Sequence, residues 1–292
     1  MIDLHTHSTC SDGSDTPSQI IAKAAQLGLK AVALTDHDVV DGLAEFQSAA
    51  KAYPDLIALN GVELAVSWPD ADVEILALNI THAAPFAERQ QLLLQKRNEA
   101  NFERVRLLQK IGFDITMEEL SRDQNGQPRK VVGRPHFAEL MLKKGYVSSF
   151  QEAFRKYMLE GCPAYVPRQN PPLRETVEFI RANGAFASLA HPVHTKMDND
   201  KLAVFLKKIK GYGLSGVECY HSDHSPEQIC SYLEMARKIG LYPTGGSDYH
   251  GLVHPDTQLG IGKGGLQVPD SILDPILNGA RCMPARRMKQ ER

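Results

Sequence analysis

Cysteines are few in this sequence, and none is spaced for a disulfide framework or a zinc knuckle. The 292-residue chain has an odd number of them, scattered at Cys10, Cys162, Cys219, Cys230 and Cys282. Because disulfide scaffolds and CxxC zinc sites use regularly spaced cysteines, neither is expected here. No GxSxG elbow occurs and no histidine pattern accompanies a cysteine, which argues against covalent acyl chemistry. We expect Cys219, late in an apolar run, to be a small buried hydrophobic residue.

The chain also lacks long apolar runs and an excess of one charge. No stretch of about 18 apolar residues occurs, and the first residues show neither the basic nor the apolar segment of an export signal. We therefore expect a soluble, cytoplasmic protein without a membrane partner. Its 33 basic and 35 acidic residues give a formal charge of −2, which argues against sequence-independent binding of duplex DNA. Small anionic substrates and short single strands remain open as partners.

Seven short apolar runs recur along the chain, and most lead to a polar residue able to do chemistry. Their length and continuous hydrophobicity are typical of strands buried on both faces. Helical patterns lie between most of them, which predicts parallel βαβ units with active residues at the carboxyl ends of the strands. Seven strands predict an α/β fold of the distorted (β/α)7 barrel type. The runs are Met1–Leu4, Ala31–Thr35, Leu56–Leu59, Val73–Leu76, Ala185–Ala190, Gly216–Tyr220 and Leu241–Gly246.

Helix signals accompany the predicted strands. Thr16 is followed by Pro17 and Gln19, which predicts an N-cap, a first-turn proline and a capping box, and Gly28 suits the end of this helix. Further helical patterns cover residues 41–52, 172–183, 198–211 and 226–239.

One stretch breaks the alternation of strands and helices. Residues 82–170 contain no convincing strand and begin with a long, charged helical pattern. Helix starts follow at Thr116 and at Ser149, each with a glutamate three residues later, as in a capping box. We interpret residues 82–170 as a helical insertion over the barrel mouth, within one domain of residues 1–292. We expect it to act as a lid that helps to select the substrate.

Histidines and carboxylates gather after the predicted strands. His5 and His7 lie two residues apart, on one face of an extended chain, and Asp248 and His250 repeat this arrangement. Between them come Asp12, the Asp36-His37-Asp38 run and Glu63. One histidine at a strand end is usually a hydrogen-bonded structural residue, so the interpretation rests on the whole set. Imidazoles and carboxylates without thiolates favour Mn²⁺, Fe²⁺ or Zn²⁺, and the size of the set predicts two or three ions roughly 3.5–4 Å apart.

Five short motifs carry a resemblance to a known family. They are HTHSTCSDG at residues 5–13, TDHD at 35–38, GVE at 61–63, HPV at 191–193 and SDYHG at 247–251. In this order they resemble the polymerase-and-histidinol-phosphatase (PHP) family, whose fold is a distorted (β/α)7 barrel. The resemblance spans the whole chain and includes GRPH at 133–136. It extends to the stand-alone bacterial phosphoesterases, which include 3′,5′-nucleotide bisphosphate phosphatases and 5′-3′ exoribonucleases.

The resemblance also implies a ligand set for metal ions. The residues are His5, His7, Glu63 and Asp248 for one ion, Asp12, His37 and His250 for another, and Glu63 with His191 for a site between them. PHP proteins often carry histidine where this chain has Glu74, which can still ligate through oxygen. The resemblance thus implies two ions and makes a third depend on Glu74, with Mn²⁺ as the favoured metal.

Several residues outside this ligand set are candidates for substrate contacts. Arg134 stands at a predicted helix start, where its guanidinium and backbone N–H groups favour phosphate; otherwise it is a surface arginine paired with a carboxylate. His194 is expected to orient phosphate or protonate the leaving group, and His221 follows the sixth strand toward the same mouth. For His194 the alternative is an exposed loop residue. Tyr165 and Arg168 either contact the substrate or pack the insertion against the barrel.

The reaction implied by this site is hydrolysis of a phosphate ester. Metal ions lower the pKa of a bound water toward neutrality and so provide a hydroxide nucleophile without Ser or Cys. We place His194, Asp248 and His37 in the catalytic set. The resemblance favours removal of the 3′-phosphate from nucleoside 3′,5′-bisphosphates, such as conversion of pAp to AMP and phosphate.

Other functions remain open. A 5′-3′ exoribonuclease would need a groove with stacking aromatics and basic residues, and the 7% aromatic content argues against processive binding of long strands. Histidinol phosphatase, another activity of the family, would need an acidic contact for the substrate amine. Barrel amidohydrolases also have HxH after the first strand, but the second half of this chain follows the phosphoesterase pattern. A non-catalytic module that serves a polymerase would be expected to have lost ligands that this chain keeps.

Overall fold

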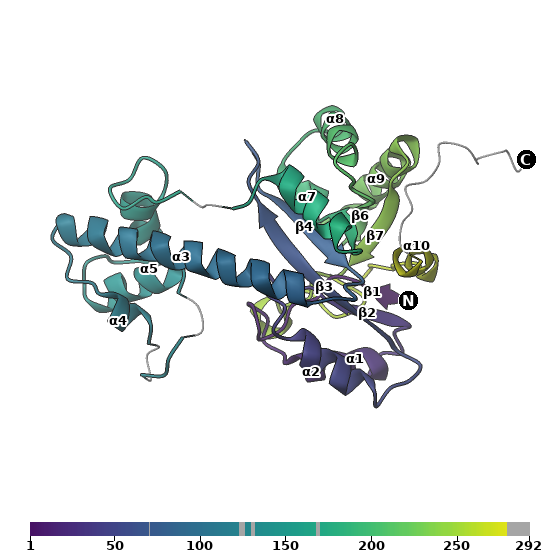
Figure 1. Cartoon of the computed structure of the whole chain (residues 1–292), viewed down its shortest axis with the longest axis horizontal. Coiled ribbons are helices and arrows are strands. Elements are labelled where there is room, and N and C mark those ends of the chain that lie inside the picture. Colours follow the sequence, from purple (N-terminus) through teal and green to yellow (C-terminus); the bar gives the residue numbers. More distant parts are fainter. Residues whose placement is uncertain (70, 123–125, 130–131, 168–169, 279–292) are drawn as a thin grey trace, which may run out of the picture. The chain divides into compact units, whose positions relative to one another are not determined.

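The computed structural model describes every residue except 70, 123–125, 130–131, 168–169 and 279–292. The described residues form two compact units (Figure 1). The first contains Met1–Glu88 and the chain from Pro171 onward, and the second contains Arg89–Asn170. The boundary falls within the helix Ala84–Lys110 (α3), whose Phe86 packs into the core of the first unit. The predicted insertion thus corresponds mainly to the second unit, and its position over the barrel mouth stays a prediction.

A seven-stranded sheet forms the centre of the first unit, with the strands in chain order. They are β1 (Ile2–Asp3), β2 (Ala31–Leu34), β3 (Ile57–Val66), β4 (Val73–Leu78), β5 (Phe186–Leu189), β6 (Gly216–His221) and β7 (Tyr242–Gly246). Each predicted apolar run is therefore a strand. The two edges of the sheet meet, since the Leu4 N–H donates to the Gly245 carbonyl at 3.2 Å. The predicted distorted, seven-stranded α/β barrel is confirmed.

One strand corrects the prediction of parallel pairing. β4 pairs antiparallel with both β3 and β5, whereas the other neighbouring strands pair in parallel. A parallel pair needs a crossover of about a dozen residues or more, and only residues 67–72 connect β3 to β4, so the chain folds straight back. The reversal pairs Glu74, near the start of β4, with Ala65, near the end of β3. Glu74 therefore lies at the edge where the parallel strands end.

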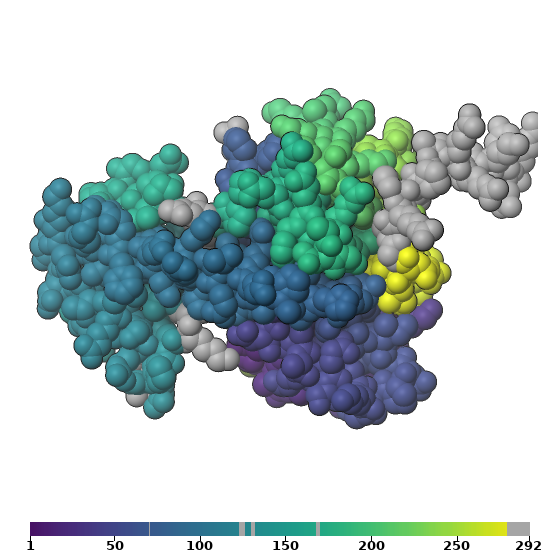
Figure 2. All heavy atoms as spheres, viewed as in Figure 1, coloured from purple at the N-terminus to yellow at the C-terminus, as the bar shows by residue number. Residues whose placement is uncertain are grey.

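Helices cover the outside of the barrel. Those of the first unit are α1 (Pro17–Gln26), α2 (Leu43–Ala50), α7 (Leu173–Ala182), α8 (Asn199–Lys210), α9 (Pro226–Ile239) and α10 (Leu273–Leu277), with 3-10 turns at Pro192–Thr195, Gly251–Val253 and Asp270–Ile272. α1 packs on α2, and the two form a continuous part of the surface, at the purple end of the colours in Figure 2. The predicted capping box between Thr16 and Gln19 is present. No described helix is long and apolar enough to cross a membrane.

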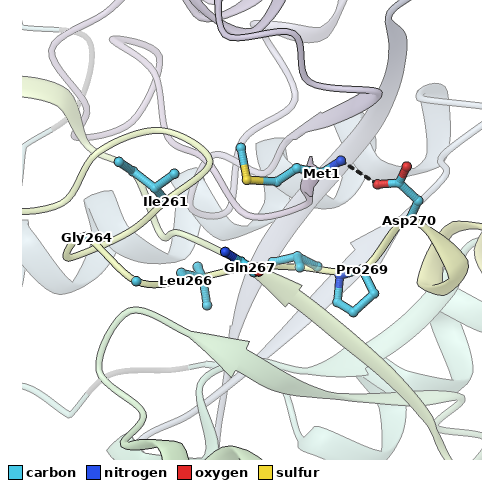
Figure 3. Close-up of a pocket in the computed structure, with 9 residues that line it drawn as sticks. Met1, Ile261, Gly264, Leu266, Gln267, Pro269 and Asp270 are labelled. Atoms are coloured by element: carbon cyan, nitrogen blue, oxygen red, sulfur yellow. Dashed lines mark ion pairs between the residues drawn. The ribbon is translucent and has the colours of Figure 1, made fainter.

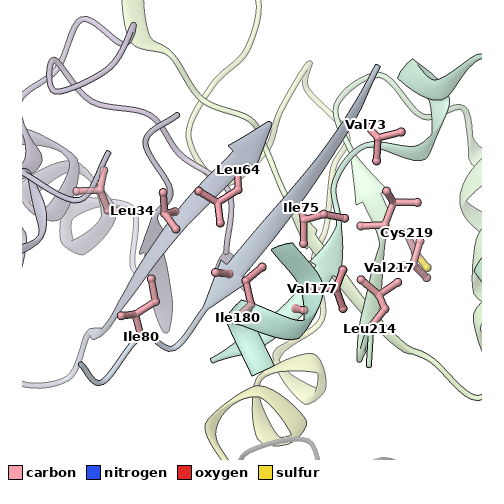
Figure 4. Close-up of a cluster of buried hydrophobic side chains, with 14 of the residues drawn as sticks. Leu34, Leu64, Val73, Ile75, Ile80, Val177, Ile180, Leu214, Val217 and Cys219 are labelled. Atoms are coloured by element: carbon pink, nitrogen blue, oxygen red, sulfur yellow. The ribbon is translucent and has the colours of Figure 1, made fainter. Parts of the chain in front are cut away.

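Apolar side chains fill both sides of the sheet. Along β2, Val32 and Leu34 belong to the cluster between the sheet and its helices, whereas the two alanines that alternate with them belong to the cluster inside the barrel. Figure 4 shows the outer cluster, where Ile75 of β4 and Ile180 of α7 both contribute. Burial on both faces explains why the strands have continuous apolar sequences instead of alternating ones. Cys219 is fully buried in the outer cluster, as expected.

The second unit is helical and has an apolar core of its own. Besides most of α3 it contains α4 (Met117–Leu120), α5 (Arg134–Lys143), α6 (Phe150–Ala153) and a π-helical turn at Phe154–Met158. Leu108, Phe137 and Met141 are fully buried in its core. Among the residues described there, no strand occurs, only an isolated bridge between Arg122 and Pro128.

The predicted helix starts of the second unit differ in detail. Thr116 forms the complete capping box with Glu119. Ser149 caps α6 by accepting from the Glu152 N–H, but the Glu152 carboxylate accepts from the backbone and hydroxyl of Ser148. The second box is therefore only half formed, because a neighbouring serine competes for the carboxylate.

Barrel closure depends on a glycine of β7. A Cβ at Gly246 would lie 2.3 Å from the backbone nitrogen of His5 and 2.4 Å from its Cβ. No real side chain tolerates such contacts, so any larger residue would force β7 away from the end of β1. Since His5 is also the first candidate metal ligand, the same contact positions the site.

Replacing Gly246 with alanine should destabilise the first unit by about 2 kcal/mol, as overpacking of a core does. Urea unfolding followed by circular dichroism measures this. Gly265→Ala is the control, because nothing lies within 4 Å of a Cβ there; its effect should stay below about 0.5 kcal/mol. Equal unfolding midpoints for the two variants would show that closure does not depend on the Gly246 contact.

Candidate metal centre

The nine predicted metal ligands converge at the edge of the barrel where the parallel strands end. They come from β3, from the start of β4, and from the segments that follow β1, β2, β5 and β7. Each has a nitrogen or oxygen atom within 3.4 Å of another member of the set. We call this set the metal cluster: His5, His7, Asp12, His37, Glu63, Glu74, His191, Asp248 and His250.

Glu63 lies at the centre of the metal cluster and is fully buried. Its Oε1 atom lies 2.8 Å from Nε2 of His191, and its Oε2 atom lies 3.0 Å from Nδ1 of His37 and 3.3 Å from Nε2 of His5. Burial by itself raises the pKa of Glu63, but the charges of His5 and His37 and the hydrogen bond between His191 and Oε1 hold it well below its usual range. Glu63 is therefore a carboxylate with imidazoles on two sides.

Several buried polar atoms of the metal cluster have no hydrogen-bond partner among the described residues. They are Nε2 of His5, both ring nitrogens of His7 and Oε2 of Glu63. Buried polar atoms are almost always paired, so their convergence without partners is typical of side chains that ligate a cation. Two ligands of one cation, each at about 2.1 Å, lie roughly 3.0–3.4 Å apart. The separations of Glu63 Oε2 from His37 and His5 match this, and these residues fit divalent cations.

The metal cluster offers three positions for cations. In each, the candidate ligand atoms all lie within 4.8 Å of one another. The first position has His5, His7, Glu63 and Asp248, the second has His7, Asp12, His37 and His250, and the third has His37, Glu63 and Glu74. His7 and His37 each occur twice, and a neutral imidazole ligates one ion only.

Distances assign the shared histidines. Nε2 of His7 lies 3.1 Å from Oδ1 of Asp248, whereas its Nδ1 lies 3.8 Å from Asp12, which favours the first position. His37 has one ring nitrogen 3.6 Å from Asp12 and the other 3.6 Å from Glu74, so it can complete the second or the third. His191 lies 3.4 Å from Glu74 as well as against Glu63, and therefore gives the third position an imidazole in either case.

Sequence reasoning missed Glu218, which orients His5. The carboxylate of Glu218 lies 3.1 and 3.3 Å from Nδ1 of His5 and accepts from the His191 N–H at 2.7 Å. Because Glu218 contacts Nδ1 of His5, the other ring nitrogen, Nε2, faces Glu63. Metal-binding histidines typically have such a carboxylate at the ring nitrogen that does not bind the ion. Burial raises the pKa of Glu218, but the charge and hydrogen bond of His5, together with the charges of His221 and His191, outweigh it and lower that pKa. The sequence signal that could have identified Glu218 is an acidic residue within an apolar strand. A carboxylate buried there needs a positively charged or hydrogen-bonding partner.

His221 also faces the metal cluster because β6 is irregular. Glu218 and His221 are three residues apart, which would place them on opposite faces of a regular strand. A register shift after Glu218 in the pairing with β7 brings both to the same side. The Asp223 N–H donates to Nδ1 of His221, so the neutral ring carries its proton on Nε2, 3.5 Å from Oδ2 of Asp248. This predicted substrate residue is therefore placed as a hydrogen-bond donor at the cluster.

Two candidate ligands have backbone conformations that side chains rarely adopt. Asp248 has φ of 58° and His191 has φ of 20°. The Asp248 N–H donates to the His5 carbonyl at 2.9 Å, and the His191 N–H donates to Glu218. These two hydrogen bonds hold the turns after β7 and β5 that direct both side chains into the cluster, where strained residues often lie.

The loop that carries Asp12 is fixed by Asp36. The Ser8 N–H and the hydroxyls of Ser8 and Ser11 donate to the Asp36 carboxylate at 2.7, 2.7 and 2.6 Å. Asp36 thus positions a ligand-bearing loop and is not itself in the metal cluster, although His37 beside it is.

His194 lies beside the metal cluster and is held by Asp223. Its Nε2 lies 2.9 Å from Oδ2 of Asp223, whose other oxygen accepts from Lys263. Burial raises the pKa of Asp223, but the hydrogen bonds from Lys263 and His194 outweigh it and lower that pKa to about 2. The His194 and His191 rings are 4.4 Å apart between centroids, and the His194 side chain is 41% exposed. It is therefore open to a substrate bound at the cluster.

The remaining predicted substrate residues belong to the second unit. Arg134 is the first residue of α5, as predicted, and its guanidinium lies over the Phe154 ring, 5.9 Å from the centroid. Tyr165 is partly buried in the same unit. Arg168 lies outside the described residues. Contacts of these three residues with a substrate stay predictions.

A separate cavity of about 550 Å³ lies near the start of β1 (Figure 3). The segment 261–270 lines it together with Met1, whose amino group pairs with Asp270 at 2.6 Å. None of its lining residues is a candidate ligand. Because His5 follows β1, the metal cluster lies at the opposite end of this strand.

Comparison with known proteins agrees with the sequence motifs. Residues 3–167, more than half of the chain, match the model of a family described as PHP domain. The chain belongs to the PHP domain family. This PHP protein is 34% identical over 254 residues to the 3′,5′-nucleoside bisphosphate phosphatase of Chromobacterium violaceum. The aligned region covers 85% of this chain and 87% of that one.

Two further PHP comparisons extend over nearly the whole chain. The 5′-3′ exoribonuclease of Haemophilus influenzae is 28% identical over 275 residues, 93% of this chain and 96% of that one. A solved structure from Bifidobacterium adolescentis, described as a metal-dependent phosphoesterase, has a TM-score of 0.72 at 27% identity and covers 95% of both chains. The resemblance to this branch of the PHP family is confirmed.

Replacing Glu218 with glutamine should weaken cation binding although no ligand is removed. The amide keeps the shape of the side chain but loses the charge that orients His5, and such changes behind a metal-binding histidine cost about 10- to 100-fold in affinity. Calorimetric titration of the metal-free protein with Mn²⁺ measures the loss. The matched control is Glu178→Gln, which breaks an exposed ion pair on α7. Equal Mn²⁺ affinity of the two variants would contradict the role given to Glu218.

Proposed function

We propose that this PHP protein is a metal-dependent phosphoester hydrolase that removes the 3′-phosphate from nucleoside 3′,5′-bisphosphates, converting pAp to AMP and phosphate. The observation that carries the proposal is the convergence of buried, unpaired imidazole and carboxylate atoms around Glu63. The substrate class is supported by the similarity to the Chromobacterium violaceum phosphatase.

The proposed cofactors are two or three divalent ions held by the nine residues of the metal cluster, Mn²⁺ being favoured and Fe²⁺ or Zn²⁺ being alternatives. Bound there, such ions would acidify a water and neutralise phosphoryl oxygens. Asp248 and His37, assigned to the catalytic set, act as ligands. Asp248 contacts His7 through one carboxylate oxygen and His221 through the other. His37 contacts Glu63 through one ring nitrogen and Asp12 through the other.

The protein's own residues position the ester and its leaving group. His221 presents its Nε2 proton where it can donate to a phosphate oxygen. His194, oriented by Asp223, is proposed to protonate the leaving 3′-oxygen. Arg134, with Tyr165 and Arg168, is proposed to bind the remainder of the nucleotide, because a guanidinium can engage a second phosphate in bidentate fashion.

A second candidate function is 5′-3′ exonucleolytic cleavage of short RNA. The relative from Haemophilus influenzae supports it, because the similarity extends over 93% of this chain. Both reactions hydrolyse a phosphate ester at the same type of centre. They differ in the group beyond the scissile bond, so substrates distinguish them better than active-site variants do.

Phosphate release by the Mn²⁺-loaded protein tests the proposal. The substrates are pAp, AMP, histidinol phosphate and a short 5′-phosphorylated RNA, with Asp248→Asn as the blank. We expect kcat/KM for pAp to exceed that for AMP by about a hundredfold, roughly 2.7 kcal/mol. Nucleotide release from the RNA, at a rate equal to or above that for pAp, would favour the exoribonuclease. No turnover above the blank with any substrate would overturn both candidates.

Replacing His194 with glutamine should slow pAp hydrolysis by about a hundredfold, as loss of a general acid does. The effect should be much smaller with p-nitrophenyl phosphate, whose leaving group needs no proton. Steady-state kinetics on both substrates measures the difference, and His82→Gln, at an exposed histidine, is the control. An equal loss on the two substrates would mean that His194 binds phosphate and does not protonate the leaving group.

A further inference from the structure

Glu74 gives the third position of the metal cluster its own donor chemistry. Its Oε1 lies 3.6 Å from Nδ1 of His37 and its Oε2 lies 3.4 Å from Nε2 of His191. Both separations exceed a direct hydrogen bond, and the one to His191 matches the spacing of two ligands around one ion. The side chain is 28% exposed, so it lies at the cluster's edge and remains accessible to solvent.

The opposing carboxylate of the third position is Glu63, which supplies an independent observation. Glu63 is fully buried, and its Oε2 has no hydrogen-bond partner among the described residues. Its Oε1 lies against His191, the same imidazole that Glu74 faces. Two carboxylates therefore converge on one histidine, and the position is defined by more than an acidic cluster.

The three positions differ in the balance of nitrogen and oxygen. The first has two imidazoles and two carboxylates, and the second, with His37 assigned to it as the family resemblance implies, has two imidazoles and one carboxylate. The third then has two carboxylates and the single imidazole of His191. Carboxylate oxygens suit Mn²⁺ and Mg²⁺, whereas imidazoles favour Zn²⁺. The third position is therefore the one least selective for Zn²⁺ over Mn²⁺.

We propose that Glu74 makes the third position a site for a hard divalent cation, Mn²⁺ or Mg²⁺, so that the protein can hold a mixed set of ions with Zn²⁺ or Fe²⁺ in the histidine-rich positions. The proposal rests on the metal-dependent function proposed above and adds a preference specific to this chain. Since Zn²⁺ binds most donor sets more tightly than Mn²⁺ does, the relevant quantity is the ratio of the two affinities at this position.

Metal competition tests the proposal without any substrate. The chelator-treated full chain is equilibrated with buffered free Mn²⁺ and Zn²⁺, and bound metals are counted by mass spectrometry and by the Mn²⁺ paramagnetic resonance signal. Glu74→His should keep the number of bound ions and lower the Mn²⁺ to Zn²⁺ ratio at the third position by roughly tenfold or more. Glu74→Gln, nearly isosteric, should lose the third ion.

Glu234→Gln is the matched control, since Glu234 lies on α9 in an exposed pair with Lys238. It should leave ion count and ratio unchanged. An unchanged ratio in Glu74→His, or a third ion retained by Glu74→Gln, would overturn the proposal. Failure of the proposed function is separate: a shifted metal ratio without pAp hydrolysis would reject only the phosphatase, and pAp hydrolysis without a shift would reject only the role of Glu74.

Discussion

The burial of one carboxylate, that of Glu63, is the constraint on which the rest of the site depends. A charged group removed from water is stable only beside opposite charges or hydrogen-bond donors. Glu63 is surrounded by imidazoles from three separate segments, with His5 and His7 after β1, His37 after β2 and His191 after β5. A barrel in which parallel strands end at one edge brings such distant segments together.

Two departures from a regular barrel complete this arrangement. β4 is antiparallel, so its first residues, and with them Glu74, lie where the other strands end. β6 changes register with β7, so Glu218 and His221 face the same side despite their odd spacing. In a regular parallel barrel Glu74 would lie at the far edge of the sheet. Bulges and reversals commonly mark functional sites, because they redirect individual side chains.

Hydrogen bonds to one ring nitrogen of an imidazole determine which ring nitrogen points into the metal cluster. Glu218 engages Nδ1 of His5 and leaves Nε2 free toward Glu63. A backbone N–H occupies Nδ1 of His221 and leaves a proton on Nε2. Histidine is thus a candidate metal ligand at His5 and a hydrogen-bond donor at His221. His194 differs from both, since Asp223 and Lys263 hold it at the surface, where water screens their charges.

Local signals in the sequence determined the strands, most helix boundaries and the histidines and carboxylates at strand ends. Apolar runs, capping residues and the HxH spacing act within a few residues, so they can be read along the chain. The pairing of β4 with β5, the role of Glu218 and the contact of His221 with Asp248 were decided only by the tertiary structure. The physical reason is that each depends on pairing between distant segments: His5 and Glu218 are 213 residues apart, and only closure of the barrel brings their side chains into contact.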